Sequence, residues 1–380
     1  MAKHDFKEEA LALHKKLGGK IGIAPRATVK TPNDLSRLYT PGVGAVASHL
    51  AKHKDQTRDY TMQGRMIAII SDGSAVLGLG NIGPEGALPV MEGKAVLFKS
   101  FANVDAFPLV LSTQDTDEVV ETILHIAPTF GGINLEDIAA PRCFEIEARL
   151  KKKLSIPVFH DDQHGTAIAV LAGLLNAFYV AKKKLKQARI VIVGAGAAGT
   201  AIAKLLHQYG VKDIVMVDRS GIIEKRRAKL SLHKKELAKL TNPRGLKGDL
   251  STAVQGADAI VGVSGPERIS AADISSMATD PIVFALANPI PEIMPNEARK
   301  GGARIIATGR SDFQNQLNNS LVFPGVFRGA LDNRVTNITD GMKIRAAEKL
   351  AAVVKNPTAH AFMPSSFDKK VVPAVASAIR

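Results

Sequence analysis

The stretch that most constrains the fold of this chain is VIVGAGAAGTA, in which Gly194, Gly196 and Gly199 have the spacing G-x-G-x-x-G. The apolar run ARIVIV precedes these glycines, and the helix-forming run AAGTAIAKLL follows them. The next apolar run, DIVMV, leads into Asp218. A strand, a glycine turn, a helix and a second strand ending in an acid begin a dinucleotide-binding fold, so this segment predicts a Rossmann-type domain.

Each residue of this segment has a predicted physical role. Gly194 makes the tight turn, Gly196 lets the backbone approach a pyrophosphate, and Gly199 lets the helix pack on the strand. The phosphates would lie at the positive N-terminal end of that helix. Asp218 would accept hydrogen bonds from the ribose hydroxyls. The predicted cofactor-binding loop consists of Gly194, Ala195, Gly196, Ala197, Ala198 and Gly199.

A second G-x-G-x-x-G, at Gly78, Gly80 and Gly83, lacks this context. Pro84 and Pro89 follow it and disfavour the clean start of a long helix. The motif also lacks a following strand that ends in an acid at the usual distance of about 20 residues. It therefore predicts a glycine-rich loop, which either approaches a ligand such as a substrate carboxylate or is a set of turns that need positive φ.

Strands and helices alternate after residue 188, which predicts an α/β fold with a doubly wound parallel sheet. The expected strands are 189–193, 213–217, 258–263, 281–286 and 304–307, with a helix at 197–209 and a basic helix within 224–248. Before this region, RMIAIISDGS and AFPLVLS predict buried strands, DTDEVVETILHIAP predicts a helix that ends before Pro128, and IPVFHDDQHGTAIAV predicts a strand, a tight turn and a long helix. The predicted division is a smaller α/β substrate domain at 1–155, a C-terminal Rossmann domain at 156–340, and a helical tail at 341–380 that packs back on the body.

Composition narrows the class of protein. The chain has 380 residues, of which 46% are hydrophobic, as is ordinary for a globular protein of this size. A single cysteine, Cys143, excludes an intrachain disulfide and is consistent with a reducing, cytoplasmic setting. The charged, amphipathic N-terminus is not typical of a secretory signal, and no apolar run reaches the ~20 residues of a membrane span.

Positive charge is concentrated in one segment. The net charge is +14, and residues 224–248 contribute +7 of it, from nine Lys and Arg and two Glu. The segment contains no aromatic residue that could stack on a base. A solvated surface therefore explains it better than nucleic-acid binding, and its charge could also attract an anionic substrate or cofactor.

Acidic residues gather in two places that follow predicted strands: Glu136 and Asp137 in GGINLEDIAAP, and Asp161 and Asp162 in VFHDDQHG. Carboxylates directly after apolar strands are costly unless they are paired. A hard dication, Mg²⁺ or Mn²⁺, would satisfy such a group of oxygen ligands.

Two alternatives to that metal site remain open. His160 and His164 flank the two aspartates and suggest zinc, although their spacing does not clearly form a tetrahedral site. Asp162, next to a helix start, could also serve only as a helix N-cap.

Several other polar residues allow both an ordinary and a functional interpretation. By default Lys94, within VMEGKAVLF, is a surface lysine, and Tyr39, at a helix end before Pro41, is a packed aromatic. Asn288 ends the run VFALAN at the carboxyl end of a strand, where α/β sheets bind ligands. Asn318 and Asn319, before SLVFPG, are equally ambiguous.

Seven motifs taken together resemble the malic enzyme family in its shorter bacterial form. They occur in family order between about residue 30 and residue 330: LYTPGV, SDGSAVLGLGNIGPEGALPVMEGKAVLFK, INLEDIAAPRCFEIE, IPVFHDDQHGTA, GAGAAGTAIA, FALANPIPE and NNSLVFPG. The resemblance implies oxidative decarboxylation of (S)-malate to pyruvate and CO₂ by a homodimer, with NAD(P) and Mg²⁺ or Mn²⁺.

The resemblance also implies roles for individual residues. Tyr39 matches the general acid of the family, and Lys94 matches its general base, which also contacts substrate. Asp161 matches a residue that supports the site, and Asn288 one near the nicotinamide. The implied metal ligands are Glu136, Asp137 and Asp162, and the implied substrate residues are Lys94, Asn318 and Asn319. Residues 78–83 match a loop of the substrate domain, so only the 194–199 loop is expected to bind the dinucleotide.

Some features leave the chemistry open. Longer family members carry an arginine in the glycine-rich loop that binds a substrate carboxylate, where this chain has Ala75. Asp218 favours NAD because it would repel a 2′-phosphate, whereas Arg219 and the basic segment beyond it could accommodate NADP. The same site could instead decarboxylate oxaloacetate with little redox activity. A redox-sensing regulator that binds nucleic acid is a further alternative of a different class.

Overall fold

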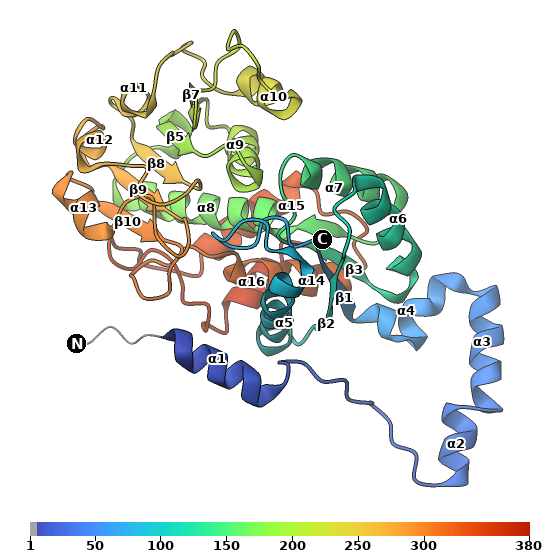
Figure 1. Ribbon diagram of the computed structural model, residues 1–380. Helices are drawn as coiled ribbons and strands as arrows, with labels where there is room; N and C mark the ends of the chain where they lie inside the picture. Colours follow the sequence, from blue (N-terminus) through green and yellow to red (C-terminus); the bar gives the residue numbers. More distant parts are fainter. Residues whose placement is uncertain (1–5) are drawn as a thin grey trace.

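A computed structural model describes residues 6–380. Two sheets, each with a parallel core, form the body of the molecule, and helices cover them (Figure 1). The long helix α8 (Asp161–Val180) links the sheets. Its buried residues belong to one apolar core that includes residues from both sheets, such as Ile67 and Ile190. The chain therefore has the predicted α/β architecture of two adjoining units.

The first sheet has the order β2-β1-β3-β4 and is entirely parallel. Its strands are β1 (Met66–Ser71), β2 (Asp105–Val110), β3 (Gly132–Leu135) and β4 (Val158–His160). The helices that follow its strands are α5 (Gly83–Ala102), α6 (Thr116–Ile126) and α7 (Arg142–Lys153). Because β4 pairs with β3, this sheet extends beyond residue 155, where the sequence places the domain boundary.

The second sheet has the order β10-β9-β8-β5-β6-β7. Its strands are β5 (Arg189–Val193), β6 (Asp213–Asp218), β7 (Gly221–Ile222), β8 (Ala259–Gly262), β9 (Ile282–Ala285) and β10 (Ile305–Thr308). All neighbours are parallel except β7, which pairs antiparallel with β6. The five strands predicted from the sequence are present with ends shifted by one residue at most. Strand order reverses at β5, and the carboxyl end of such a switch point is where doubly wound sheets bind ligands.

Two helices differ from the sequence prediction. α5 starts at Gly83 and runs for 20 residues, although Pro84 and Pro89 argued against a long helix there. Pro84 lies in the first turn, where a missing N–H costs nothing, and the buried face around Met91 and Phe98 stabilises the rest of the helix. The basic helix is short: only α10 (Leu232–Leu240) forms within 224–248.

The glycine-rich loop before α5 combines the two proposed explanations for its glycines. Gly80 and Gly83 have φ of 80° and 76°, so these positions are turns that favour glycine. Gly78 instead allows a close approach, because a Cβ there would lie 2.1 Å from the Asn288 carbonyl oxygen. The loop thereby contacts the other domain.

The C-terminal segment packs back on the body, with α15 (Asp340–Ala351) against α8 and α16 (Val371–Ala376) against α14 (Phe323–Asp332). The remaining α-helices are α9 (Ala197–Tyr209), α11 (Leu250–Val254), α12 (Ala271–Ser275) and α13 (Pro295–Lys300). The 3₁₀ turns are η1 (Lys54–Gln56), η2 (Met62–Gly64), η3 (Ala127–Thr129), η4 (Leu185–Gln187) and η5 (Asn319–Leu321).

The N-terminal helices form an arm, residues 6–60, which extends away from the two sheets (Figure 1). Its helices are α1 (Phe6–Leu17), α2 (Pro32–Leu38), α3 (Gly42–Lys52) and α4 (Thr57–Tyr60), and none of them buries a residue. Large apolar side chains on the arm are exposed, including those of Leu11, Leu38, Tyr39 and Tyr60. Across residues 6–380, no helix combines the length and the apolar character that crossing a membrane requires.

Candidate active site

A cleft between the two domains forms a pocket of about 1000 Å³. Residues that follow β3 and β4 line one side, and residues that follow β5, β8 and β9 line the other. The carboxyl ends of both sheets therefore face one cavity, as expected for ligand sites in α/β folds.

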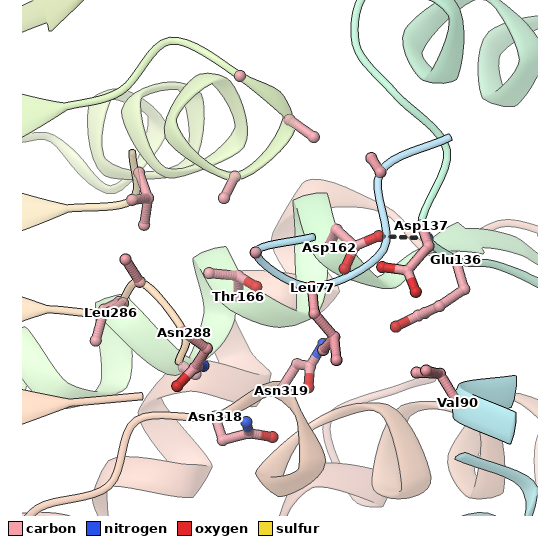
Figure 2. Close-up of a pocket in the computed structure, with 18 of the residues that line it drawn as sticks. Leu77, Val90, Glu136, Asp137, Asp162, Thr166, Leu286, Asn288, Asn318 and Asn319 are labelled. Atoms are coloured by element: carbon pink, nitrogen blue, oxygen red, sulfur yellow. Dashed lines mark hydrogen bonds between the residues drawn. The ribbon is translucent and has the colours of Figure 1, made fainter. Parts of the chain in front are cut away.

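Three carboxylates meet in this pocket, and Figure 2 shows them directed toward one another. Glu136 and Asp137 come directly after β3, and Asp162 lies in the first turn of α8. One ligand atom from each residue lies within 4.8 Å of the others. Asp162 Oδ2 also accepts a hydrogen bond of 2.8 Å from the Asp137 backbone N–H. Because α8 begins at Asp161 and its N-cap is His160, the simple N-cap role considered for Asp162 is wrong.

The electrostatics of this cluster favour a bound cation. Burial raises the pKa of Asp137 to about 9, and the nearby Asp162 and Glu136 charges act in the same direction. Burial also raises the pKa values of Glu136 and Asp162. Within residues 6–380, Asp137 Oδ2 is buried and has no hydrogen-bond partner. Grouped carboxylates with raised pKa values are stabilised by a dication, and an all-oxygen donor set suits Mg²⁺ or Mn²⁺.

The two histidines considered for zinc do not join this cluster. His164 Nε2 lies 2.9 Å from Glu147 Oε1, so that ring is engaged elsewhere. His160 is fully buried, and its Nδ1 lies 3.9 Å from Asp162 Oδ2, beyond hydrogen-bond distance. Among the described residues, the ligand atoms that cluster come from the three carboxylates alone.

Lys94 lies against these carboxylates and is not the surface lysine of the default interpretation. Lys94 is only 7% exposed and lies on the inner face of α5. The amine Nζ is 2.6 Å from Glu136 Oε1, donates a short hydrogen bond to Asp161 Oδ2, and lies 4.1 Å from the centre of the Phe323 ring. Burial would lower the pKa of Lys94, but Asp161 and Glu136 outweigh burial and raise the pKa above its ordinary value.

The glycine loop after β5 has the geometry predicted for a phosphate site. Gly194 has a φ of 118°, and a Cβ at Gly199 would lie 1.9 Å from the Gly194 carbonyl oxygen. A Cβ at Gly196 would meet open space, as a residue that approaches a ligand requires. Gly196 precedes α9, whose start lacks a side-chain cap, so backbone N–H groups there are free to bind an anion. Ala197 and Ala198 line the pocket beside Gly196.

The predicted asparagines also line the pocket (Figure 2). Asn288 follows β9, and Asn318 and Asn319 come from the turn before α14. Ala75 lines the pocket as well, and among the described lining residues the only cationic side chain is that of Lys94. The cation that would replace the missing arginine is therefore not found in this pocket.

Tyr39 is the one predicted catalytic residue that lies elsewhere. It caps α2 in the arm, is 66% exposed, and does not line the pocket. The structure of one chain thus brings Lys94 and the three carboxylates together without Tyr39.

Two polar or aromatic groups of the pocket, Ser264 and Phe323, are not among the residues that the sequence predicts for the site. Ser264 follows β8, and the rule that placed Asn288 at the carboxyl end of a strand would also have found Ser264. Phe323, within the quoted motif NNSLVFPG, covers the Lys94 amine. Nothing in the sequence separates that phenylalanine from an ordinary core residue.

Comparisons with known proteins identify the family of this chain. Residues 19–151 match the malic enzyme N-terminal domain, and residues 163–378 match the malic enzyme NAD-binding domain. The bifunctional malic/malolactic enzyme of Bacillus subtilis (strain 168) is 54% identical, over 98% of this chain and 92% of its own length. The NAD-dependent malic enzyme of Geobacillus stearothermophilus is 53% identical, over 96% of this chain and 76% of its own. The crystal structure of the NAD-dependent malic enzyme of Thermotoga maritima has a TM-score of 0.94 and 48% identity, covering 97% of this chain and 98% of that one. The chain therefore belongs to the malic enzyme family.

Proposed function

We propose that this protein catalyses the oxidative decarboxylation of (S)-malate to pyruvate and CO₂, with reduction of NAD(P) and a requirement for Mg²⁺ or Mn²⁺. The observation that carries the proposal is the trio of carboxylates beside the Lys94 amine, two of them buried and one half-buried, in a pocket that is also lined by the glycine loop. The relatives described above, which are malic enzymes, support the same reaction.

Glu136, Asp137 and Asp162 would hold the cation. Their oxygen-only donor set and the unpartnered, buried Asp137 Oδ2 fit a hard dication. When bound, the cation would polarise the oxygen on C2 of the substrate, and the nicotinamide would take the hydride from that carbon.

Lys94 would act as the general base and remove the proton of the C2 hydroxyl. A base must be neutral, whereas Glu136 and Asp161 hold this amine as an ammonium in the structure described here. Once the charge of the neighbouring carboxylates is neutralised, burial dominates and lowers the pKa of the amine. Asp161, which is fully buried, would keep the amine in position.

Asparagine side chains would orient the other two ligands. Asn318 and Asn319 offer amide groups to the substrate, in a pocket whose described lining includes no arginine. Asn288, at the end of β9, would contact the nicotinamide.

Loss of CO₂ leaves an enolate that must receive a proton at C3, and Tyr39 would supply it. The described residues that line the pocket include no tyrosine, histidine or cysteine to serve as this acid. Tyr39 is exposed on an arm whose apolar residues, such as Leu38 and Val43, are exposed too. We therefore propose a homodimer in which the arm of each chain packs on the other chain and brings Tyr39 to its pocket.

The experiment is an initial-rate assay at the absorbance band of the reduced nicotinamide. It combines (S)-malate, Mn²⁺ and NAD or NADP, and pyruvate is measured in parallel. We expect one pyruvate for each nicotinamide reduced, and no reaction when malate or the cation is omitted. Rapid loss of CO₂ from oxaloacetate without any malate-dependent reduction would instead identify the protein as an oxaloacetate decarboxylase.

A further inference from the structure

The carboxylate expected to bind the cofactor ribose is already occupied. Asp218 Oδ1 accepts hydrogen bonds from the Ser220 backbone N–H, at 2.9 Å, and from Arg227 Nη1, at 3.0 Å. Asp218 Oδ2 accepts from Arg227 Nη2 and from Lys234 Nζ, the latter at 2.7 Å. Four donors leave this carboxylate little capacity to accept the hydroxyls of a ribose.

The same contacts remove the argument that Asp218 repels phosphate. Burial alone would raise the pKa of Asp218, but the hydrogen bonds from Arg227 and Lys234 outweigh it and lower the pKa to about 2. The carboxylate is therefore ionised, and its charge is offset by two cations in direct contact. Arg219, the next residue, is exposed and has no ion-pair partner within residues 6–380. The end of β6 therefore carries a net positive charge, because one carboxylate, that of Asp218, lies among three cations: Arg219, Arg227 and Lys234.

This positive site lies beside the phosphate loop. Asp218 ends β6, which pairs with β5, and β5 leads into the loop. On the other side, α10, which carries Lys234, packs against α9, the helix that begins in that loop. A dinucleotide whose pyrophosphate lies at the start of α9 would therefore place its adenosine ribose near Asp218 and Lys234.

There is also room for a phosphate group. A cavity of about 660 Å³ borders this cluster and is lined by Arg219, Ser220, Arg227 and Lys247. Two carboxylates, Glu224 and Asp249, also lie on this lining, against the three cations Arg219, Arg227 and Lys247. Lys234 does not line the cavity itself and joins the cluster through Asp218 Oδ2.

We propose that this chain uses NADP in preference to NAD, and that Arg219 and Lys234 bind the 2′-phosphate while Arg227 keeps Asp218 neutralised. This inference rests on the proposed function, because it assigns the cofactor of the same site. It reverses the preference for NAD that Asp218 alone suggested, since the sequence could not show that the carboxylate is paired.

The test has a binding arm and a turnover arm. In the first, NADPH and NADH are titrated into the protein and followed by nicotinamide fluorescence, with 2′,5′-ADP and 5′-AMP as competitors. In the second, kcat/KM is measured for NADP and NAD with malate and Mn²⁺. The variants are Arg219→Ser, Lys234→Ser and their combination, and Lys235→Ala, an exposed lysine one residue further along α10, is the matched control.

We expect the unmodified protein to bind NADPH and 2′,5′-ADP roughly tenfold or more tightly than NADH and 5′-AMP, because each charge-assisted contact to the phosphate contributes that much. Each variant should lose roughly tenfold in affinity for NADPH and little for NADH, and Lys235→Ala should lose neither. Equal or tighter binding of NADH, or variants that weaken both cofactors alike, would overturn the inference. A protein that binds NADPH tightly but does not oxidise malate with either cofactor would keep the inference and refute the proposed function.

Discussion

At the scale of single residues, the site depends on how Lys94 and the acids around it share their charges. The amine contacts Glu136 and Asp161, and the Asp137 and Asp162 carboxylates lie just beyond. Full ionisation of the three buried acids and the half-buried Asp162 against one lysine would leave excess negative charge, which is costly in a largely buried site. The acidic cluster therefore favours binding of a positively charged ligand. Its role is in function, because without that ligand it does not stabilise the fold.

Replacing the base should separate chemistry from cofactor binding. Lys94→Ala should reduce malate-dependent nicotinamide reduction by at least about 10²- to 10⁴-fold, because no other amine lies in the described pocket lining. Dinucleotide affinity, measured by fluorescence titration, should remain within about twofold, since the Lys94 amine contacts Glu136, Asp161 and the Phe323 ring, which lie outside the glycine loop. The matched control is Lys99→Ala on the same helix, which removes only an exposed ion pair with Asp105 and should keep full activity. Near-normal turnover in Lys94→Ala would remove the base assignment.

The raised pKa of Asp137 predicts how cation affinity depends on pH. With a pKa of about 9 in the metal-free protein, this carboxyl holds its proton at neutral pH and must release it to bind a cation. The affinity for Mn²⁺ should therefore increase as the pH rises from about 6 toward about 9, by up to about tenfold per pH unit for one proton. Calorimetric titration in two buffers of different ionisation enthalpy would reveal the released proton. An affinity that stays constant over that interval would show that Asp137 is already ionised.

The sequence predicts part of the site at this scale. Glu136 and Asp162 each follow a strand, and the carboxyl ends of parallel strands meet at one edge, so their convergence could be expected. The burial of Lys94 could not be expected, because it depends on how α5 packs against the first sheet. The local sequence of α5 does not show that packing. The ion pairs of Asp218 likewise depend on a loop conformation without a sequence signature.

At the scale of elements, the junctions between strands and helices set the positions of the functional groups. β3 ends directly before Glu136, β4 passes without a loop into α8, and β5 passes through a three-residue turn with two glycines into α9. The strands could be predicted because their apolar runs are continuous and bounded by glycine or polar residues. The length of α5 could not be predicted, because the packing of its buried face outweighs the unfavourable proline at position 89.

The glycine loop offers a matched pair of substitutions. Gly199→Ala should destabilise the protein by about 1–3 kcal/mol and weaken dinucleotide binding, because its Cβ would clash with the Gly194 carbonyl oxygen. Gly196→Ala meets no atom within 4 Å, so it should keep its thermal stability and weaken only the dinucleotide. Thermal unfolding and fluorescence titration of both variants separate the two effects. Equal stability of the two variants would contradict the close packing assigned to Gly199.

At the scale of the whole molecule, the two sheets and α8 share one apolar core beside the pocket, and the arm extends away from them (Figure 1). The arm leaves apolar residues such as Leu11, Leu13 and Leu17 in contact with solvent, which is unfavourable for a chain on its own. The sequence alone does not show that these apolar residues are exposed, because an amphipathic helix has the same pattern whether it packs on its own chain or on another. The exposed apolar side chains of the arm therefore support the dimer that the family resemblance predicts.

A mixed dimer tests whether Tyr39 acts across chains. Neither the Tyr39→Phe nor the Lys94→Ala homodimer should oxidise malate at an appreciable rate. A hybrid purified through two different tags should recover about half of the unmodified activity, because one of its two sites combines an intact Lys94 with an intact Tyr39. A hybrid as inactive as both parents would mean that Tyr39 serves its own chain.

The most direct measurement for the account as a whole is Mn²⁺ binding by the unmodified protein and by Asp162→Asn, followed by the electron paramagnetic resonance of free Mn²⁺. The asparagine keeps an oxygen that can accept the Asp137 N–H but removes the ligand charge. Glu121→Gln, an exposed acid on α6, is the control. We predict that the unmodified protein binds one Mn²⁺ per chain. Asp162→Asn should lose more than about tenfold in Mn²⁺ affinity and should also lose malate oxidation, and Glu121→Gln should change neither. Unchanged Mn²⁺ binding and turnover in Asp162→Asn would contradict a cation site at Glu136, Asp137 and Asp162.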